Sequence, residues 1–309
     1  MQAQRLDRGG LWAAIFAYAL WGVFPLYWQL LKHVPALEII SHRVIWCAIF
    51  VVGWLLLLDR GRGFRTALAT PRVLPMLLAS SVLISANWGL YIWAVTHGHV
   101  VDSSLGYFIN PLVNVALGVL VLGERLNPRQ WTAVALAALG VAWLTWQLGH
   151  PPWIALSLAL TFGAYGLIRK LAAVESVQGL GLESGILFLP ALLLLLVGTQ
   201  WSGFVGLAHA PSDWLLLIFG GALTALPLIG FAYGARRIPF TMIGVLQYIS
   251  PSLQLLCGVW LLHEPFTRTQ LVGFSLIWAG LLVYALDGWW RARHPVVVTP
   301  ELDTADACR

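Results

Sequence analysis

Long stretches of apolar residues run along almost the whole chain and are interrupted by short polar or charged gaps. A stretch of about 20 mostly apolar residues is long enough to cross the hydrocarbon core of a bilayer as a helix. Because that core holds no water, each backbone N–H and C=O must find a partner inside its own segment, which favours helices. The pattern therefore predicts ten transmembrane helices, at residues 11–31, 35–58, 72–95, 101–123, 128–148, 152–168, 182–197, 213–234, 240–263 and 269–286.

The composition agrees with an all-α membrane protein. Of the 309 residues, 59% are hydrophobic and 10% are charged, whereas a soluble domain carries about 25% charged residues. We attribute the formal net charge of +5 to arginines on the cytoplasmic side of a membrane, and we expect no nucleic-acid partner. Cys47, Cys257 and Cys308 have neither disulfide nor metal-ligand spacing, so the sequence predicts no metal and no cofactor.

The basic residues give an independent test of the predicted spans. All 18 Lys and Arg residues except Lys32, Arg43 and Arg268 fall at the N-terminus, in the even-numbered gaps or in the C-terminal tail. Lys and Arg accumulate on the cytoplasmic side of membrane proteins, so this alternation predicts that both termini are cytoplasmic. Residues 1–9 are then a cytoplasmic N-terminus and residues 290–309 a cytoplasmic, disordered tail. The first run resembles a signal peptide, but at about 20 apolar residues it is too long, and we expect it to be retained.

The chain repeats its own pattern after about 140 residues, a period at which the stretch 106–126 coincides with 246–266. The matched residues are Pro111 with Pro251, Gly118 with Gly258, and Glu124 with Glu264. The repeats cover residues 10–148 and 149–289, and each contains five predicted spans. Because five is odd, the second repeat must be inverted across the membrane, as in secondary transporters whose substrate site lies between the halves. A duplication without transport is the alternative.

A tyrosine precedes a proline early in the fourth and ninth predicted spans, and a glutamate ends each of these spans. The residues are Tyr107, Pro111 and Glu124 in one span, and Tyr248, Pro251 and Glu264 in the other. With this element the chain resembles the EamA-type drug/metabolite transporter superfamily, which is built from two five-helix units. The strings AYALWGVFPLYW, SHR, NWGLYIWAV and SSLGYFINPL make it most similar to the RarD group. The resemblance implies an inner-membrane permease of a group named for chloramphenicol sensitivity.

Arg43 is the first candidate for a substrate-binding residue. It lies eight residues into the second predicted span, or about 12 Å at 1.5 Å per residue. A buried guanidinium suits a carboxylate, a phosphate or a nitro group through its fixed fork of donors. The corresponding segment of the second repeat, residues 182–185, has no arginine. The alternative is that Arg43 reaches the membrane surface or pairs with a helix end.

Polar and aromatic residues in the third, fourth and ninth predicted spans are further candidates, because polar groups inside a membrane usually face the bundle interior. These residues are Asn87, Trp88, Tyr91, Tyr107, Asn110, Asn114, Gln247, Tyr248, Ser250 and Gln254. Asn110 and Asn114 form a polar stripe in the first repeat, and Ser250 and Gln254 form one at the matched positions of the second. Such matched stripes are typical of a central cavity. Alternatively, they satisfy the carbonyl groups that Pro111 and Pro251 leave without a donor.

Three remaining acids have other roles in this interpretation. Glu38 and His42 share a helix face and form either a proton-sensitive pair or an interfacial ion pair. A carboxylate at the end of a helix opposes the helix dipole. Glu124 and Glu264 are therefore interpreted as structural residues, each capping the first turn of the helix that follows it with the assistance of Asn127 or Thr267.

A secondary transporter that moves a small organic solute across the inner membrane by alternating access fits these observations best. Proton coupling is an open alternative, as is a homodimer, and the expected partners are a small-molecule substrate and membrane lipid. The rival classes are a membrane-embedded enzyme, a structural membrane protein, a channel and an ATP-driven pump. The spans contain no GxSxG, HExxH or Walker sequence and no filter-like sequence, so we expect no enzymatic activity.

Overall fold

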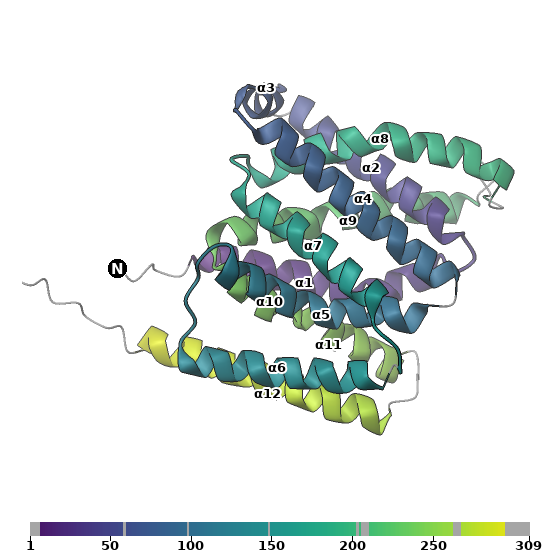
Figure 1. Cartoon of the computed structure of the whole chain (residues 1–309). Helices are drawn as coiled ribbons and strands as arrows, with labels where there is room; N and C mark the ends of the chain where they lie inside the picture. The colour runs from purple at the N-terminus through teal and green to yellow at the C-terminus, as the bar shows by residue number, and fades with distance from the viewer. Residues whose placement is uncertain are drawn as a thin grey trace, which may run out of the picture.

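The computed structural model of the chain describes residues 7–57, 60–97, 99–147, 149–201, 204, 210–261 and 267–293. Within these residues the regular secondary structure is entirely helical (Figure 1). The elements are α1 (Arg8–Gln29), α2 (Ala36–Leu57), α3 (Arg62–Ala69), α4 (Val73–Thr96), α5 (Val100–Leu120), α6 (Pro128–Trp146), α7 (Trp153–Leu171), α8 (Ser176–Trp201), α9 (Pro211–Arg237), α10 (Phe240–Gln247), α11 (Ile249–Leu256), the π-helical turn η1 (Cys257–Leu261) and α12 (Arg268–Arg293).

The prediction of a multi-span helical membrane protein is confirmed. Among the described residues, nine segments are long and apolar enough to cross a bilayer. They are α1, α2, α4, α5, α7, α8, α9, the segment Phe240–Leu261 that contains α10 and α11, and α12. The remaining predicted span forms α6, but this helix opens with Pro128, Arg129 and Gln130, which lower its hydropathy. That α6 is a tenth span stays a prediction.

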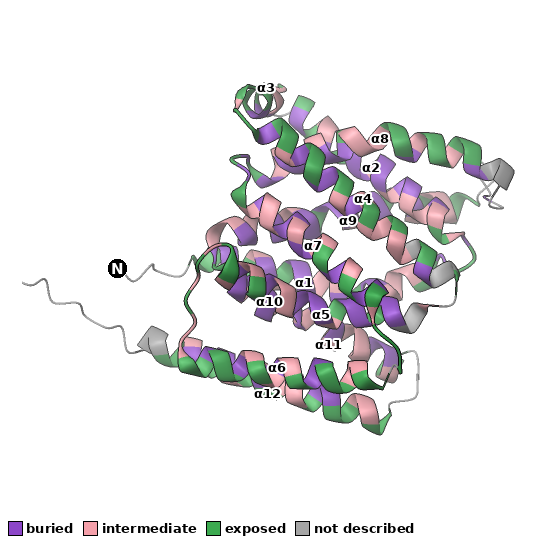
Figure 2. Cartoon of the chain, viewed as in Figure 1, coloured by how far each residue is buried: buried purple, intermediate pink, exposed green. Residues whose placement is uncertain are grey.

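The outer surface of the bundle is apolar. Figure 2 shows exposed stretches along α6, α8 and α12, and large hydrophobic side chains lie there. Leu189, Leu193 and Leu196 on α8 and Leu282 on α12 are more than half exposed. A large continuous apolar surface is rare on a soluble monomer, so a lipid environment explains it.

The helices of the two predicted repeats interdigitate in a symmetric pattern. Helix α1 packs against α9 and α11, and its counterpart α7 packs against α4 and α5. Corresponding helices also meet each other, α2 with α8, α5 with α10, and α6 with α12. This exchange of partners is what a two-fold relation between the halves requires.

Two glycines at matched positions allow close approaches between the halves. A Cβ added to Gly22 of α1 would lie 2.6 Å from the Cβ of Leu253, and one added to Gly163 of α7 would lie 2.7 Å from Cγ1 of Val113. Both pairs of positions are related by the period seen in the sequence. The repeated glycine therefore keeps the same helix–helix contact on both sides of the bundle.

Helices α6 and α12 form a separate pair along one edge of the bundle (Figure 1). Asn127 caps α6, since its side chain accepts a hydrogen bond from the backbone N–H of Gln130 and the Gln130 side chain accepts one from Asn127. The Asn127 amide also donates to Asp287 of α12 at 2.8 Å, and Arg129 lies 3.6 Å from the same carboxylate. These contacts join the start of α6 to the end of α12.

The predicted continuous span at residues 240–263 is interrupted. Helix α10 ends at Gln247, and the N–H of Tyr248 donates to the carbonyl of Val245, only three residues back, at 3.3 Å. Helix α11 then begins at Ile249 and contains Pro251, which has no N–H to donate and whose ring crowds the preceding turn. The span is therefore divided at Tyr248 into two short helices.

Candidate functional site

A cavity of about 360 Å³ lies between the two halves of the bundle. Helices α1, α2, α4 and α5 line it from the first half, and α7, α9, α11 and the end of α10 line it from the second. Most of the predicted binding residues are brought together there. They are Arg43, Asn87, Trp88, Tyr91, Tyr107, Asn110, Gln247, Ser250 and Gln254.

Arg43 reaches into this cavity from α2. Its Nε donates to Oγ1 of Thr224 on α9 at 3.0 Å, which fixes the side chain across the boundary between the halves. The guanidinium carbon lies 4.9 Å from the ring centroid of Trp28 and 5.6 Å from that of Trp88, so the cation is held between two indoles. Among the described residues, no carboxylate lies within ion-pair distance of Arg43. The guanidinium is therefore oriented but not neutralised.

Asn87 and Asn110 behave differently within the cavity wall. The Asn87 amide donates to the carbonyl of Leu158 at 2.8 Å and to Oγ1 of Thr161 at 2.9 Å, so it fastens α4 to α7. The side-chain oxygen of Asn110 is buried and has no hydrogen-bond partner among the described residues, and the same holds for the hydroxyl of Tyr18. An unsatisfied buried polar atom costs about 1–3 kcal/mol, so both are positions where a ligand group would be favourable.

The polar stripes of the two repeats meet at one point. Asn114 lies behind the cavity and donates to Oε1 of Gln247 at 2.7 Å. The Gln254 amide donates to the carbonyl of Trp21 at 3.3 Å and to Oγ of Ser250 at 3.2 Å. These bonds link polar side chains of both halves to one another and to α1. Asn114 therefore positions a cavity residue and does not line the cavity itself.

Three further predicted residues do not line the cavity. Tyr248 is 2% exposed and packs in a cluster with Leu105 and Ile109. Glu38 and His42 are buried in α2 outside the cavity wall, and the His42 ring meets that of Trp214 edge-on with centroids 5.3 Å apart. A role for this pair in proton coupling stays a prediction.

The prediction that Glu124 caps the helix that follows it is wrong. Its carboxylate accepts hydrogen bonds from the backbone N–H of Phe240 at 2.6 Å and of Thr241 at 2.8 Å, so it caps α10 of the other half. Asn127, not Glu124, caps the helix that follows. A carboxylate at a helix N-terminus is stabilised by the helix dipole, which resolves the unfavourable placement at the end of its own helix. Glu264 lies outside the described residues, and Gly258 is buried in η1.

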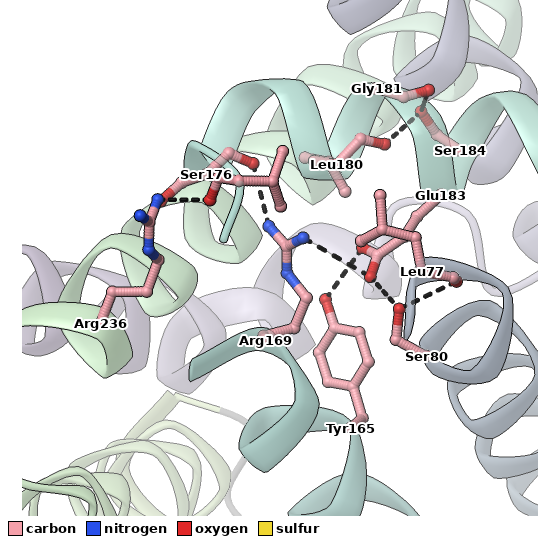
Figure 3. A network of polar contacts seen from close by, with 11 residues as sticks. Leu77, Ser80, Tyr165, Arg169, Ser176, Leu180, Gly181, Glu183, Ser184 and Arg236 are labelled. Atoms are coloured by element: carbon pink, nitrogen blue, oxygen red, sulfur yellow. Dashed lines mark hydrogen bonds and ion pairs between the residues drawn. The ribbon is translucent and has the colours of Figure 1, made fainter. Parts of the chain in front are cut away.

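The structure adds a buried charged network that the sequence analysis does not identify (Figure 3). The carboxylate of Glu183 on α8 lies 3.7 Å from Nη1 of Arg169, and it accepts hydrogen bonds from Ser80 and, at 3.5 Å, from Tyr165. The Arg169 guanidinium also donates to the carbonyl of Ser176 at 3.0 Å. An acid inside an apolar span is the signal that would have found Glu183.

The position of Glu183 is notable in the repeat. It is the residue of the second half that corresponds to Arg43. Glu183 lines a small cavity of about 20 Å³, whose wall shares Trp88 and Thr224 with the main cavity. The two matched positions therefore hold opposite charges. The Glu183 carboxylate is neutralised by Arg169, whereas the Arg43 guanidinium faces the cavity.

The fold and the cavity define a multi-pass helical membrane protein with a polar, aromatic-walled chamber between its two halves. The model of the EamA-like transporter family matches the chain twice, over residues 8–146 and 152–286. The chain belongs to this family, which confirms the resemblance seen in the sequence and makes it a multi-pass protein of the inner membrane.

Relatives support this assignment. The chain is 45% identical to Protein RarD of Streptomyces exfoliatus over 95% of this chain and 93% of the relative. It is 44% identical to an uncharacterized transporter of Pseudomonas aeruginosa, over 93% and 96%, and 44% identical to the uncharacterized transporter YojE of Bacillus subtilis, over 94% and 99%. A solved crystal structure of a protein 21% identical in sequence has the same fold, with a TM-score of 0.72 over 91% of this chain and 99% of that one.

Proposed function

We propose that this protein is a secondary transporter that moves a small organic solute across the inner membrane by alternating access between two inverted five-helix halves. The observation that supports this best is the central cavity, whose wall is contributed by both halves and contains one oriented cation. Substrate sites at the interface of inverted repeats, near the bilayer midplane, are typical of such carriers.

The cavity is displaced toward one end of the bundle. Its wall uses the second half of α1 and the first half of α2, and likewise the second half of α4 and the first half of α5. It therefore lies toward the connections between these helices. In this proposal the termini are cytoplasmic, so this end is extracytoplasmic and the cavity belongs to an outward-facing state.

The opposite end of the bundle is closed by polar contacts between the halves and within the second half. The capping of α10 by Glu124 and the Arg169–Glu183 pair lie there. Lys170 donates to the carbonyls of Ala235 and Ile238, both at 2.8 Å. An inverted repeat can form equivalent contacts at either end in turn, and in this proposal α6 crosses the membrane as the tenth span.

Binding and release fit the cavity better than catalysis does. Its wall contains no His, Cys, Asp or Glu among the described residues, so it lacks the usual groups for acid–base or metal-assisted chemistry. The related proteins named as transporters favour the same conclusion. In this proposal the protein is not an enzyme.

The experiment is uptake into proteoliposomes of a metabolite panel, with and without a pH gradient. We expect saturable uptake of at least one solute, and we expect Arg43→Ala to lower its initial rate about 100-fold, because losing one partner of a buried charge pair costs about 2–5 kcal/mol. Arg65→Ala, which removes an exposed arginine of α3, is the matched control and should transport normally. Unchanged kinetics in a well-folded Arg43→Ala protein would remove Arg43 from the site.

A further inference from the structure

We infer that the transported solute is a small organic monoanion with a flat apolar body and a hydrogen-bond donor, whose anionic group binds Arg43. This inference rests on the proposed transport function and names its substrate class. It follows from the charge of the cavity, the orientation of Arg43, the character of the walls and the unsatisfied polar atoms.

The charge of the cavity favours one negative charge on the ligand. Arg43 is the one charged residue in the described wall, and no carboxylate of the described residues pairs with it. An isolated cation in a low-dielectric interior is costly, so an anion that enters restores neutrality. A dianion such as a phosphate monoester would leave one charge uncompensated. The ammonium group of a cation or zwitterion would find no carboxylate.

The orientation of Arg43 selects the kind of anion. Thr224 takes the Nε proton, and Trp28 and Trp88 flank the guanidinium group. The two terminal nitrogens donate to no acceptor among the described residues. Their parallel N–H groups match the two oxygens of a carboxylate, which arginine binds in a bidentate manner. The edge of the guanidinium that carries the two terminal nitrogens is therefore available to bind a carboxylate.

The size and walls of the cavity select the body of the ligand. A volume of about 360 Å³ is near the lower end of ligand pockets, which span about 300–1,000 Å³. The wall includes the rings of Trp21, Trp88, Tyr91 and Phe162. Aromatic walls favour a flat ring that can stack or meet them edge-on. One ring with a short side chain satisfies both limits.

The unsatisfied polar atoms add one further requirement. The buried Oδ1 of Asn110, on the wall of the cavity, has lone pairs but no donor among the described residues. A hydroxyl or N–H on the ligand would supply that donor. The Tyr18 hydroxyl has no partner among the described residues either, but Tyr18 is fully buried, so the requirement rests on Asn110. The assigned class is therefore a hydroxylated aromatic monocarboxylate or a close relative.

The test is equilibrium binding to the purified full-length protein, followed by tryptophan fluorescence and calorimetry. The probes all carry a 4-hydroxyphenyl group and differ in charge: 4-hydroxyphenylacetate, its neutral amide, the cation tyramine and the dianion 4-hydroxyphenyl phosphate. We expect 4-hydroxyphenylacetate to bind at least 30-fold more tightly than the amide, as a charge-assisted pair requires. Tighter binding of tyramine or the dianion, equal binding of amide and carboxylate, or no binding of any probe overturns the assignment.

Variants test the role of Arg43. Arg43→Gln should remove the preference for the carboxylate over the amide, Arg43→Lys should retain part of it, and Arg65→Gln should leave it unchanged. The probe series is measured on the unmodified protein. The inference can therefore be contradicted even if an Arg43 variant fails to fold. A preference that survives in a folded Arg43→Gln protein contradicts it.

Counterflow of labelled probes in proteoliposomes separates this inference from the proposed function. Counterflow of the carboxylate supports both. Carboxylate-selective binding without counterflow supports the anion site and contradicts transport. Counterflow of the amide or of tyramine, and not of the carboxylate, supports transport and overturns the anion assignment.

Discussion

We expect Glu183→Ala to lower the free energy of unfolding by about 3–5 kcal/mol, the cost of leaving one member of a buried ion pair unpaired. Arg169 is 2% exposed, and its guanidinium packs over Gly179, where a Cβ would overlap it. Without Glu183 the charge would remain buried, and Ser80 and Tyr165 would lose their acceptor. Unfolding in mixed detergent micelles, followed by tryptophan fluorescence, measures the change.

The control for this prediction is Glu175→Ala. Glu175 also pairs with an arginine, Arg236 at 3.8 Å, but its side chain is 61% exposed, so its removal should change stability by at most about 1 kcal/mol. In the double variant Glu183→Gln with Arg169→Gln the loss should be smaller than the sum of the two single losses, because the interaction is removed from both sides. Additive losses, or a Glu183→Ala protein as stable as Glu175→Ala, would contradict a buried ion pair.

The second large effect is expected from Glu124→Ala, at about 2–4 kcal/mol. Glu124 accepts two backbone hydrogen bonds from the first turn of α10, and a charged acceptor contributes about 1.5–3 kcal/mol per bond. Glu124 is partly exposed, which lowers the sum to about 2–4 kcal/mol. Because donor and acceptor belong to different halves, the loss should also loosen their contact. Hydrogen exchange at the amides of Phe240 and Thr241 should accelerate with the drop in stability.

Asp7→Ala provides the comparison for Glu124. The Asp7 side chain accepts one hydrogen bond from the N–H of Gly10 at 2.8 Å and caps its own helix. Its ion pair with Arg237, at 3.9 Å, is partly exposed and contributes little, so we expect a loss of about 1 kcal/mol. Glu124→Gln, which keeps an acceptor but loses the charge, should fall between the two. If Glu124→Ala costs no more than Asp7→Ala and the α10 amides stay protected, the cap does not join the halves.

The sequence predicts those parts of the fold that depend on composition alone. Apolar stretches of membrane-spanning length become helices because the hydrocarbon offers no other partner for the backbone. The break at Tyr248 was not predicted, because a proline in a span either kinks a helix or is accommodated by it, as Pro111 is inside the continuous α5. Neighbouring elements decide between these outcomes.

The candidate site was predictable where helical spacing brings residues to one face. Tyr107 and Asn110, three residues apart on α5, both line the cavity, as do Gln247, Ser250 and Gln254. Tyr248 follows Gln247 directly and lies about 100° around the helix, so it points away.

Contacts between segments far apart in the chain could not be predicted from the sequence. Trp28 is one of 17 tryptophans, and nothing in its local pattern marks it as the residue that stacks on Arg43. Thr224 and the partners of Glu183 are likewise identified only by tertiary packing. For the same reason the sequence assigned Glu124 to the adjacent helix and not to α10.

The duplicated scaffold thus carries an unequal distribution of charge. The two halves repeat their close helix contacts at Gly22 and Gly163. At one pair of matched positions they differ, with Arg43 facing the cavity and Glu183 neutralised by Arg169. In the proposed mechanism, the symmetric frame allows the exchange of conformations and the asymmetric charge gives the cavity its preference for an anion.

Labelling from each side of the membrane tests the central claim most directly. Asn110→Cys, in a chain with Cys47, Cys257 and Cys308 replaced by Ser, is exposed to an impermeant maleimide in right-side-out and in inside-out vesicles. A cavity that opens to each side in turn predicts labelling from both sides, faster from the extracytoplasmic side, with a ratio that shifts when substrate is added. Labelling from one side alone under every condition, or from neither side, would contradict alternating access.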